Sequence, residues 1–194
     1  MARLRNITLC LPDWIESALP PPDQKYPRLE DRMGLAIRLA RLNLEHGTGG
    51  PFGAAIFNPA TGMLVSAGIN LVVASKCSIA HAEIVAIAIA QQILGSHDLG
   101  ATEMPSLQLV TSAEPCAMCL GAIPWSGLRS VVCGARDEDI RAIGFDEGPK
   151  TPDWPMALEA RGIAVVRDVG REDARKVLQD YLASGKPIYN GRSQ

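Results

Sequence analysis

The sequence lacks a strong net charge, a long apolar run and an even set of cysteines. The formal net charge of −2 gives no electrostatic reason to expect a nucleic acid partner. No apolar stretch approaches the ~18 residues of a membrane-spanning helix, so we expect no membrane contact. Five cysteines are an odd number in a chain long enough to bury its own core. This favours free thiols and a location in a reducing cytoplasm.

The length of 194 residues fits one compact domain with a short extension. Residues 1–29 are predicted to be an irregular arm, because Pro20, Pro21, Pro22 and Pro27 cannot lie inside a helix or a central strand. Residues 30–194 are then expected to form the single functional domain.

Apolar patterns and turn residues outline alternating elements after a first hairpin. They predict helices at 30–46, 80–94, 116–123, 137–143 and 171–184, and strands at 53–57, 63–70, 107–111, 130–134 and 163–167. Helices that alternate with strands favour an α/β domain with a mixed sheet and helices on both of its faces.

Two short motifs carry the chemistry, His81-Ala82-Glu83 and the Pro-Cys-Ala-Met-Cys run at 115–119. Cys116 and Cys119, three residues apart at a predicted helix start, would present two sulfurs on one face. Together with an imidazole nitrogen of His81 they form a three-ligand zinc set that leaves one tetrahedral position for water. Glu83 would lie beside the metal without binding it and would act as the catalytic proton shuttle.

Each motif has a plainer interpretation when it is taken alone. A Cys-x-x-Cys pair can be a structural half-site or a redox pair, and His-Ala-Glu in an alanine-rich helix can have no role. The combination of both motifs, each at a predicted helix start, is the signature of zinc deaminases. Cys77 is near His81 in sequence, but its predicted loop position gives no ligand spacing.

On these residues the chain resembles the cytidine/deoxycytidylate deaminase superfamily over about residues 30–150. The resemblance implies a three-layer α/β/α domain with a five-stranded mixed sheet. It also implies one catalytic Zn2+ per chain and a homodimer. Within the superfamily, residues 114–123 resemble bacterial guanine deaminases and tRNA adenosine deaminases, and Gly144-Phe145-Asp146-Glu147 resembles the former.

The resemblance to guanine deaminases implies several contacts with a purine base. An amide at Asn70 would read the base, Trp125 would lie beside it, and Glu147 would contact it and help to move protons. Phe52 can supply a further aromatic wall. Asp146 is the alternative acid to Glu147, and Ala82 of the His-Ala-Glu motif completes the expected set of substrate-binding residues. The implied reaction is hydrolysis of guanine to xanthine and ammonia, a step of purine catabolism.

The sequence departs from that family in two places, which keeps other functions open. The second acid is Glu147 where the family has aspartate, and the aromatic tail that closes the pocket has no clear match, with Tyr181 and Tyr189 as candidates. Aminotriazines could therefore also be substrates. A tRNA adenosine deaminase, a cytosine or cytidine deaminase, and a scaffold with structural zinc are the alternatives; the net charge argues against the first and Glu83 against the last.

Overall fold

The computed structural model describes residues 8–191 and contains one five-stranded mixed sheet in the order β2-β1-β3-β4-β5. Strand β1 (Gly53–Asn58) pairs antiparallel with β2 (Met63–Ile69) and with β3 (Gln108–Ala113). Strands β4 (Ser130–Ala135) and β5 (Ala164–Val166) continue the sheet in parallel from β3. The predicted fold class is confirmed.

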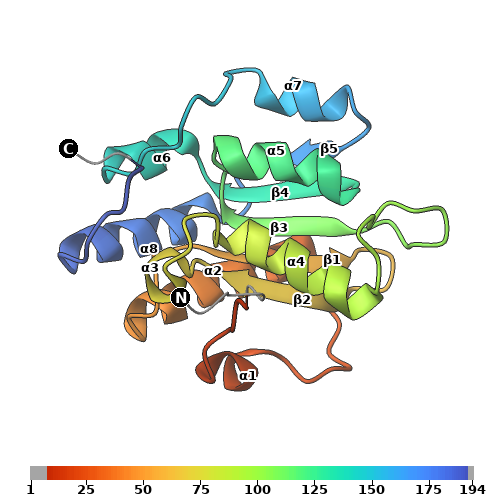
Figure 1. The fold of residues 1–194 in the computed structure, drawn as a ribbon, viewed down its shortest axis with the longest axis horizontal. Coiled ribbons are helices and arrows are strands. Elements are labelled where there is room, and N and C mark those ends of the chain that lie inside the picture. The colour runs from red at the N-terminus through yellow and green to blue at the C-terminus, as the bar shows by residue number, and fades with distance from the viewer. Residues whose placement is uncertain (1–7, 192–194) are drawn as a thin grey trace, which may run out of the picture.

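Helices cover both faces of this sheet, as Figure 1 shows. Helices α4 (Ala82–Leu94) and α5 (Ala117–Ser126) lie on one face, and α2 (Leu29–Glu45) and α8 (Arg171–Ala183) lie on the other. Side chains of one strand alternate between two apolar clusters: Ala54 and Ile56 pack toward α4, whereas Ala55 and Phe57 pack toward α2. The core therefore has two layers with the sheet between them.

Two glycines allow the helices to approach the sheet closely. A Cβ at Gly53 would lie 2.4 Å from the carbonyl oxygen of Ala36 in α2. A Cβ at Gly68 would lie 2.3 Å from the carbonyl oxygen of Ala82 in α4. Any side chain at either position would push a helix away from the sheet, and at Gly68 it would displace the start of α4.

The segment before α2 is more ordered than the sequence predicts. It contains α1 (Trp14–Ala18), whose Ile15 and Ala18 are buried, and an isolated bridge between Lys25 and Met63. The helix fits between Pro12 and Pro20, where seven consecutive residues are free of proline. Residues 1–7 of the predicted arm lie outside the described residues.

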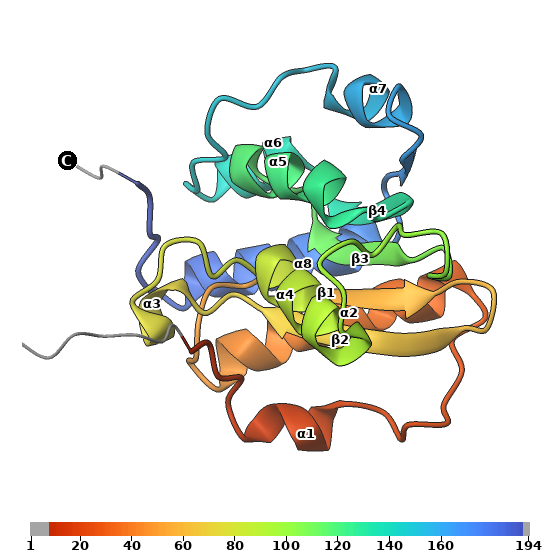
Figure 2. The same ribbon diagram turned by 45° about the vertical axis from the view of Figure 1, so that its right-hand side comes forward.

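The remaining helices are short and follow the strands. They are α3 (Val72–Ser75), α6 (Asp137–Ala142) and α7 (Trp154–Glu159), and the sequence patterns predicted only α6. In Figure 2, α3 and the segment that follows α8 lie at the same end of the sheet. No helix between residues 8 and 191 combines the length and apolar character that crossing a bilayer requires.

Candidate metal centre and active site

Two helix starts bring His81 and the two cysteines together. His81 caps α4 and Cys116 caps α5, so residues 35 apart in sequence meet at one point. The Sγ atoms of Cys116 and Cys119 lie 3.5 and 3.7 Å from Nδ1 of His81, and the three possible ligand atoms lie within 4.8 Å of one another. The positive ends of both helix dipoles favour thiolates at this point.

The donor set fits zinc. The hydrogen bond with Cys119 and then that with His81 outweigh burial and lower the pKa of the Cys116 thiol to about 4. The same hydrogen bond with Cys116, together with burial, raises the pKa of Cys119. A divalent cation bound by both sulfurs would offset their mutual repulsion, and two sulfurs with one nitrogen are a three-ligand set for catalytic zinc.

The first turn of α4 directs its acid toward the cluster. Glu83 is only 7% exposed, and burial followed by the charge of Cys116 raises its pKa. Ala82, between His81 and Glu83, instead packs in the apolar core beneath α4 and is absent from the cavity lining. Successive helical residues point about 100° apart, so the His-Ala-Glu motif cannot aim all three side chains at one substrate.

A cavity of about 420 Å³ opens over the cluster. This is a volume typical of small-molecule sites. Asn70, from the end of β2, and Phe52, from the segment before β1, line it. Of the predicted metal ligands, His81 and Cys116 line the same cavity, whereas Cys119 is fully buried. Glu83, Asp146 and Glu147 also line it.

The two neighbouring acids have different surroundings. Glu147 is 6% exposed, and its Oε2 atom is buried with no hydrogen-bond partner among residues 8–191. Burial, followed by the charge of Cys116, raises the pKa of Glu147 to about 8. Asp146 is more exposed and accepts a hydrogen bond from the Gly148 N–H at 2.9 Å. The structure thus leaves Glu147, and not Asp146, with unmet hydrogen-bonding capacity.

The C-terminal segment covers one side of the cavity and carries Tyr181 and Tyr189, the two candidates for an aromatic tail. The Tyr181 hydroxyl donates to the carbonyl oxygen of Pro187 at 2.6 Å, and both residues line the cavity with Tyr189. Asn190 accepts a hydrogen bond from the Asp146 N–H at 2.8 Å and donates one to the Gly144 carbonyl at 2.9 Å. Only folding brings this tail to the Gly144–Glu147 segment.

Aromatic rings form a second part of the wall. Phe52 and Phe145 meet edge to face with ring centroids 5.1 Å apart, and Phe145 lies 5.8 Å from Tyr181. In the sequence, Phe145 stands out only within the Gly144–Glu147 segment that resembles guanine deaminases. An aromatic residue close to a predicted active-site acid is a signal that could identify it as part of the cavity wall.

Trp125 does not reach the cavity, contrary to the sequence-based prediction. It is 89% exposed on α5 and lines a separate groove with Pro124 and Trp154. Six residues beyond Cys119, it lies about 9 Å further along the helix and on another face. The aromatic wall of the cavity therefore comes from Phe52 and Phe145.

The chain matches known deaminases. The model of the cytidine and deoxycytidylate deaminase zinc-binding region matches residues 27–135. The guanine deaminase of Bacillus subtilis (strain 168) is 40% identical over 112 residues, which are 58% of this chain and 67% of that protein.

Solved structures resemble the chain over nearly its whole length. The guanine deaminase from Nitrosomonas europaea has a TM-score of 0.89 at 45% identity, covering 94% of this chain and 100% of that chain. A variant protein in complex with 8-azaguanine matches with a TM-score of 0.89 at 45% identity, covering 95% and 100% of the two chains. Among more distant matches, tRNA-specific adenosine deaminases share 27–33% identity over 93–119 residues.

Proposed function

The chain belongs to the cytidine and deoxycytidylate deaminase family, and from this premise we propose that it hydrolyses guanine to xanthine and ammonia. Membership of the family and the cluster of His81, Cys116 and Cys119 both support zinc-dependent aminohydrolase chemistry. The choice of guanine depends on the opposite side of the cavity.

One observation carries that choice: a carboxylate oxygen of Glu147 in the cavity wall is buried and has no hydrogen-bond partner within the part of the chain that the structure describes. Burial without a partner is costly for a carboxylate, so this atom calls for N–H donors from a ligand. Guanine presents a ring N–H and an amino group next to each other, which a carboxylate can accept together. Cytosine and adenine do not present this pair of donors.

Two further side chains support a purine. Asn70 is 9% exposed, and its Oδ1 accepts the Val72 N–H at 3.3 Å, which orients the amide in the cavity wall. An amide can meet both donors and acceptors of the base. Phe52 offers a flat apolar surface beside it.

Glu83 is the proposed proton shuttle. When bound, zinc supplies a Lewis acid that lowers the pKa of a coordinated water molecule. The carboxylate of Glu83 would take the first proton of the attacking water and pass it to a ring nitrogen. It would then carry the second proton, from the hydroxyl group added to the ring, to the departing amine. Burial followed by the Cys116 charge raises the pKa of Glu83, which suits a group that must both accept and donate near neutral pH.

The test is ammonia release by zinc-loaded protein from guanine, adenine, cytosine, cytidine and an aminotriazine. We expect turnover of guanine, with or without the triazine, and a marked loss in Glu147→Gln. Asp146→Asn is the comparison at the neighbouring acid of the same cavity. It should stay within about threefold of the parent, since Asp146 is exposed and its Oδ1 already accepts the Gly148 N–H. Turnover of a pyrimidine alone, or of no compound in the panel, would contradict the proposal.

The proposal extends to assembly and location. Large apolar side chains are exposed on α4, α5 and α7, namely Ile93, Trp125 and Met156, and such surface favours a homodimer. Light scattering should give twice the chain mass, and Trp125→Ser should lower it. All five cysteines are free, which favours a cytoplasmic location.

A further inference from the structure

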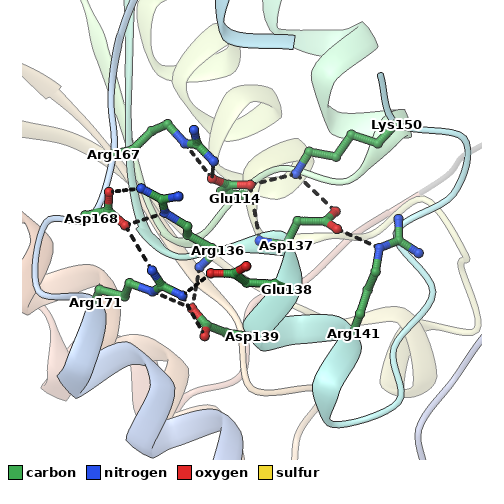
Figure 3. Close-up of polar contacts among 10 residues, drawn as sticks. All are labelled: Glu114, Arg136, Asp137, Glu138, Asp139, Arg141, Lys150, Arg167, Asp168 and Arg171. Atoms are coloured by element: carbon green, nitrogen blue, oxygen red, sulfur yellow. Dashed lines mark hydrogen bonds and ion pairs between the residues drawn. The ribbon is translucent and has the colours of Figure 1, made fainter. Parts of the chain in front are cut away.

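A buried ion pair joins the segment that carries Cys116 to the segment that carries Glu147. Glu114 follows β3, two residues before Cys116, and its side chain is 1% exposed. Lys150, three residues after Glu147, is 5% exposed, and its Nζ lies 3.1 Å from Oε2 of Glu114. Figure 3 shows Glu114 between Lys150 on one side and Arg167 on the other.

The two partners belong to the two loops that build the site. Glu114 and Cys116 lie on the segment that leads from β3 into α5, and Glu147 and Lys150 lie on the segment between α6 and α7. A second bond joins the same segments, because the Ala117 N–H donates to the carbonyl oxygen of Glu147 at 3.0 Å. The two segments are therefore joined at two points, Glu114 to Lys150 and Ala117 to Glu147. The two points are three residues apart on each segment, and Cys116 lies between them on the first.

The ion pair is firmly held in place. Oε1 of Glu114 accepts a hydrogen bond from Nε of Arg167 at 2.7 Å, and its Oε2 accepts the Asp137 N–H at 3.1 Å. Nζ of Lys150 lies 3.3 Å from Oδ1 of Asp137 and 5.1 Å from the centre of the Trp154 ring. Neither charge can turn away to solvent, so their separation is fixed by the surrounding groups.

Such a pair is not explained by stability alone. Desolvation offsets much of the attraction between buried charges, and apolar pairs of similar volume are often as stable. What an ion pair adds is a defined direction and distance between two segments, and both segments here carry active-site groups.

We propose that Glu114 and Lys150 are positioning residues that clamp the Glu147 segment onto the Cys116 segment. This inference rests on the proposed function, in which Glu147 holds the base. The clamp fixes where the base lies relative to the metal and to Glu83. Errors of about 1 Å in such placement cost about 100-fold in rate.

The experiment compares zinc-loaded Lys150→Met and Glu114→Gln with Asp139→Asn. Asp139 is a matched control: its side chain is 9% exposed and pairs with Arg171 at 2.7 Å in the same network, but it contacts neither active-site segment. Zinc content, kcat and KM for guanine, and amide exchange at Ala117 are measured for each protein.

The clamp predicts a distinct pattern. The Ala117 amide should exchange at least about tenfold faster in Lys150→Met and Glu114→Gln, because its acceptor on Glu147 is no longer held. In both variants kcat should fall about 10- to 100-fold while KM changes less than about threefold, with one zinc per chain retained. Asp139→Asn should keep the exchange rate and kcat of the parent.

Unchanged exchange at Ala117 in both clamp variants, or equal acceleration in Asp139→Asn, would overturn the inference. So would a kcat in Lys150→Met and Glu114→Gln no lower than that of the control. Should the parent fail to turn over guanine, the proposed function fails, and the Ala117 exchange still decides the clamp. Lys150→Gln, which keeps a donor of similar length, replaces Lys150→Met if the latter does not fold.

Discussion

The two sides of the cavity that would hold a base are supported by different chemistry. On one side, which we term the amide wall, Asn43 of α2 supports Gly50 and Asn70 through neutral hydrogen bonds. On the other, the ionic wall, Glu147 lies three residues before Lys150, which pairs with Glu114 within a network of charges. A ligand would thus lie between one wall that neutral hydrogen bonds hold in place and another that ion pairs hold in place.

The amide wall is complete within itself. Asn43 is fully buried, and its Nδ2 donates to the carbonyl oxygens of Gly50 at 2.8 Å and Asn70 at 2.9 Å. Its Oδ1 accepts the Thr48 hydroxyl at 2.5 Å. In the ionic wall, Glu114 and Lys150 are held by ion pairs with neighbouring charges. Glu147 has a buried carboxylate oxygen with no hydrogen-bond partner among the described residues. We therefore expect changes in the amide wall to affect mainly KM and changes in the ionic wall to affect mainly kcat.

The largest effect is expected at Glu83, which lies between the walls. Glu83→Gln should lower kcat about 10³-fold, because the shape of the side chain is kept and its proton transfer is lost. KM and the zinc content should stay close to those of the parent. Ammonia release and metal analysis check this, and full turnover by the variant would exclude Glu83 as the shuttle.

The amide wall should be sensitive to volume at Gly49. A Cβ there would lie 1.8 Å from the carbonyl oxygen of Asn70 and 2.9 Å from Nδ2 of Asn43. Gly49→Ala should therefore cost about 3 kcal/mol of unfolding free energy and raise KM.

The control is Gly34→Ala on α2, where a Cβ would meet nothing within 4 Å. This change should stabilise the protein by about 0.5–1 kcal/mol. Urea unfolding of both variants tests the difference, and similar midpoints would show that the loop at Gly49 adapts freely.

Asn43→Ala should separate the walls by kinetics. It removes the side-chain donor to the carbonyl oxygens of Asn70 and Gly50, of which Gly50 keeps the Phe52 N–H, at a cost of about 2 kcal/mol. KM should rise about tenfold and kcat change less than threefold, the reverse of the pattern expected for Lys150→Met. Steady-state kinetics of both variants measure the contrast, with Thr48→Ala as a milder change in the same wall. A fall in kcat alone would mean that the walls do not divide binding from chemistry.

The smallest expected effect is on the stability of the protein at low pH, through the Asp137 carboxylate. Burial by itself raises the pKa of Asp137, but the hydrogen bond with Arg141 and the charge of Lys150 outweigh it and hold the pKa below its ordinary value. Because the pKa is lower in the folded state, the stabilisation is present above the unfolded pKa and is lost as pH falls through the folded value. At pH 6 the free energy of unfolding of Arg141→Gln should thus be lower than that of the parent by less than about 1 kcal/mol. This difference should disappear toward pH 3. Urea unfolding at several pH values checks this, and Asn43→Ala should show no such convergence.

The sequence by itself determined the metal centre and the layered fold. Cys116 and Cys119 need only one helix start to face the same way, and His81 needs only another, so local spacing was enough to predict the ligand set. The alternation of apolar strands with helices likewise predicted a mixed sheet covered on both faces, since period and order are properties of the chain.

The tertiary structure alone decided which residues surround that centre. Trp125 follows the cysteines closely but turns to the surface with its helix, whereas Tyr181 and Tyr189 come from the far end of the chain to line the cavity. Lys150 finds Glu114 across 36 residues. Such contacts depend on how helices and loops pack over the sheet, and packing between distant segments leaves no periodic or spacing signal in a single sequence.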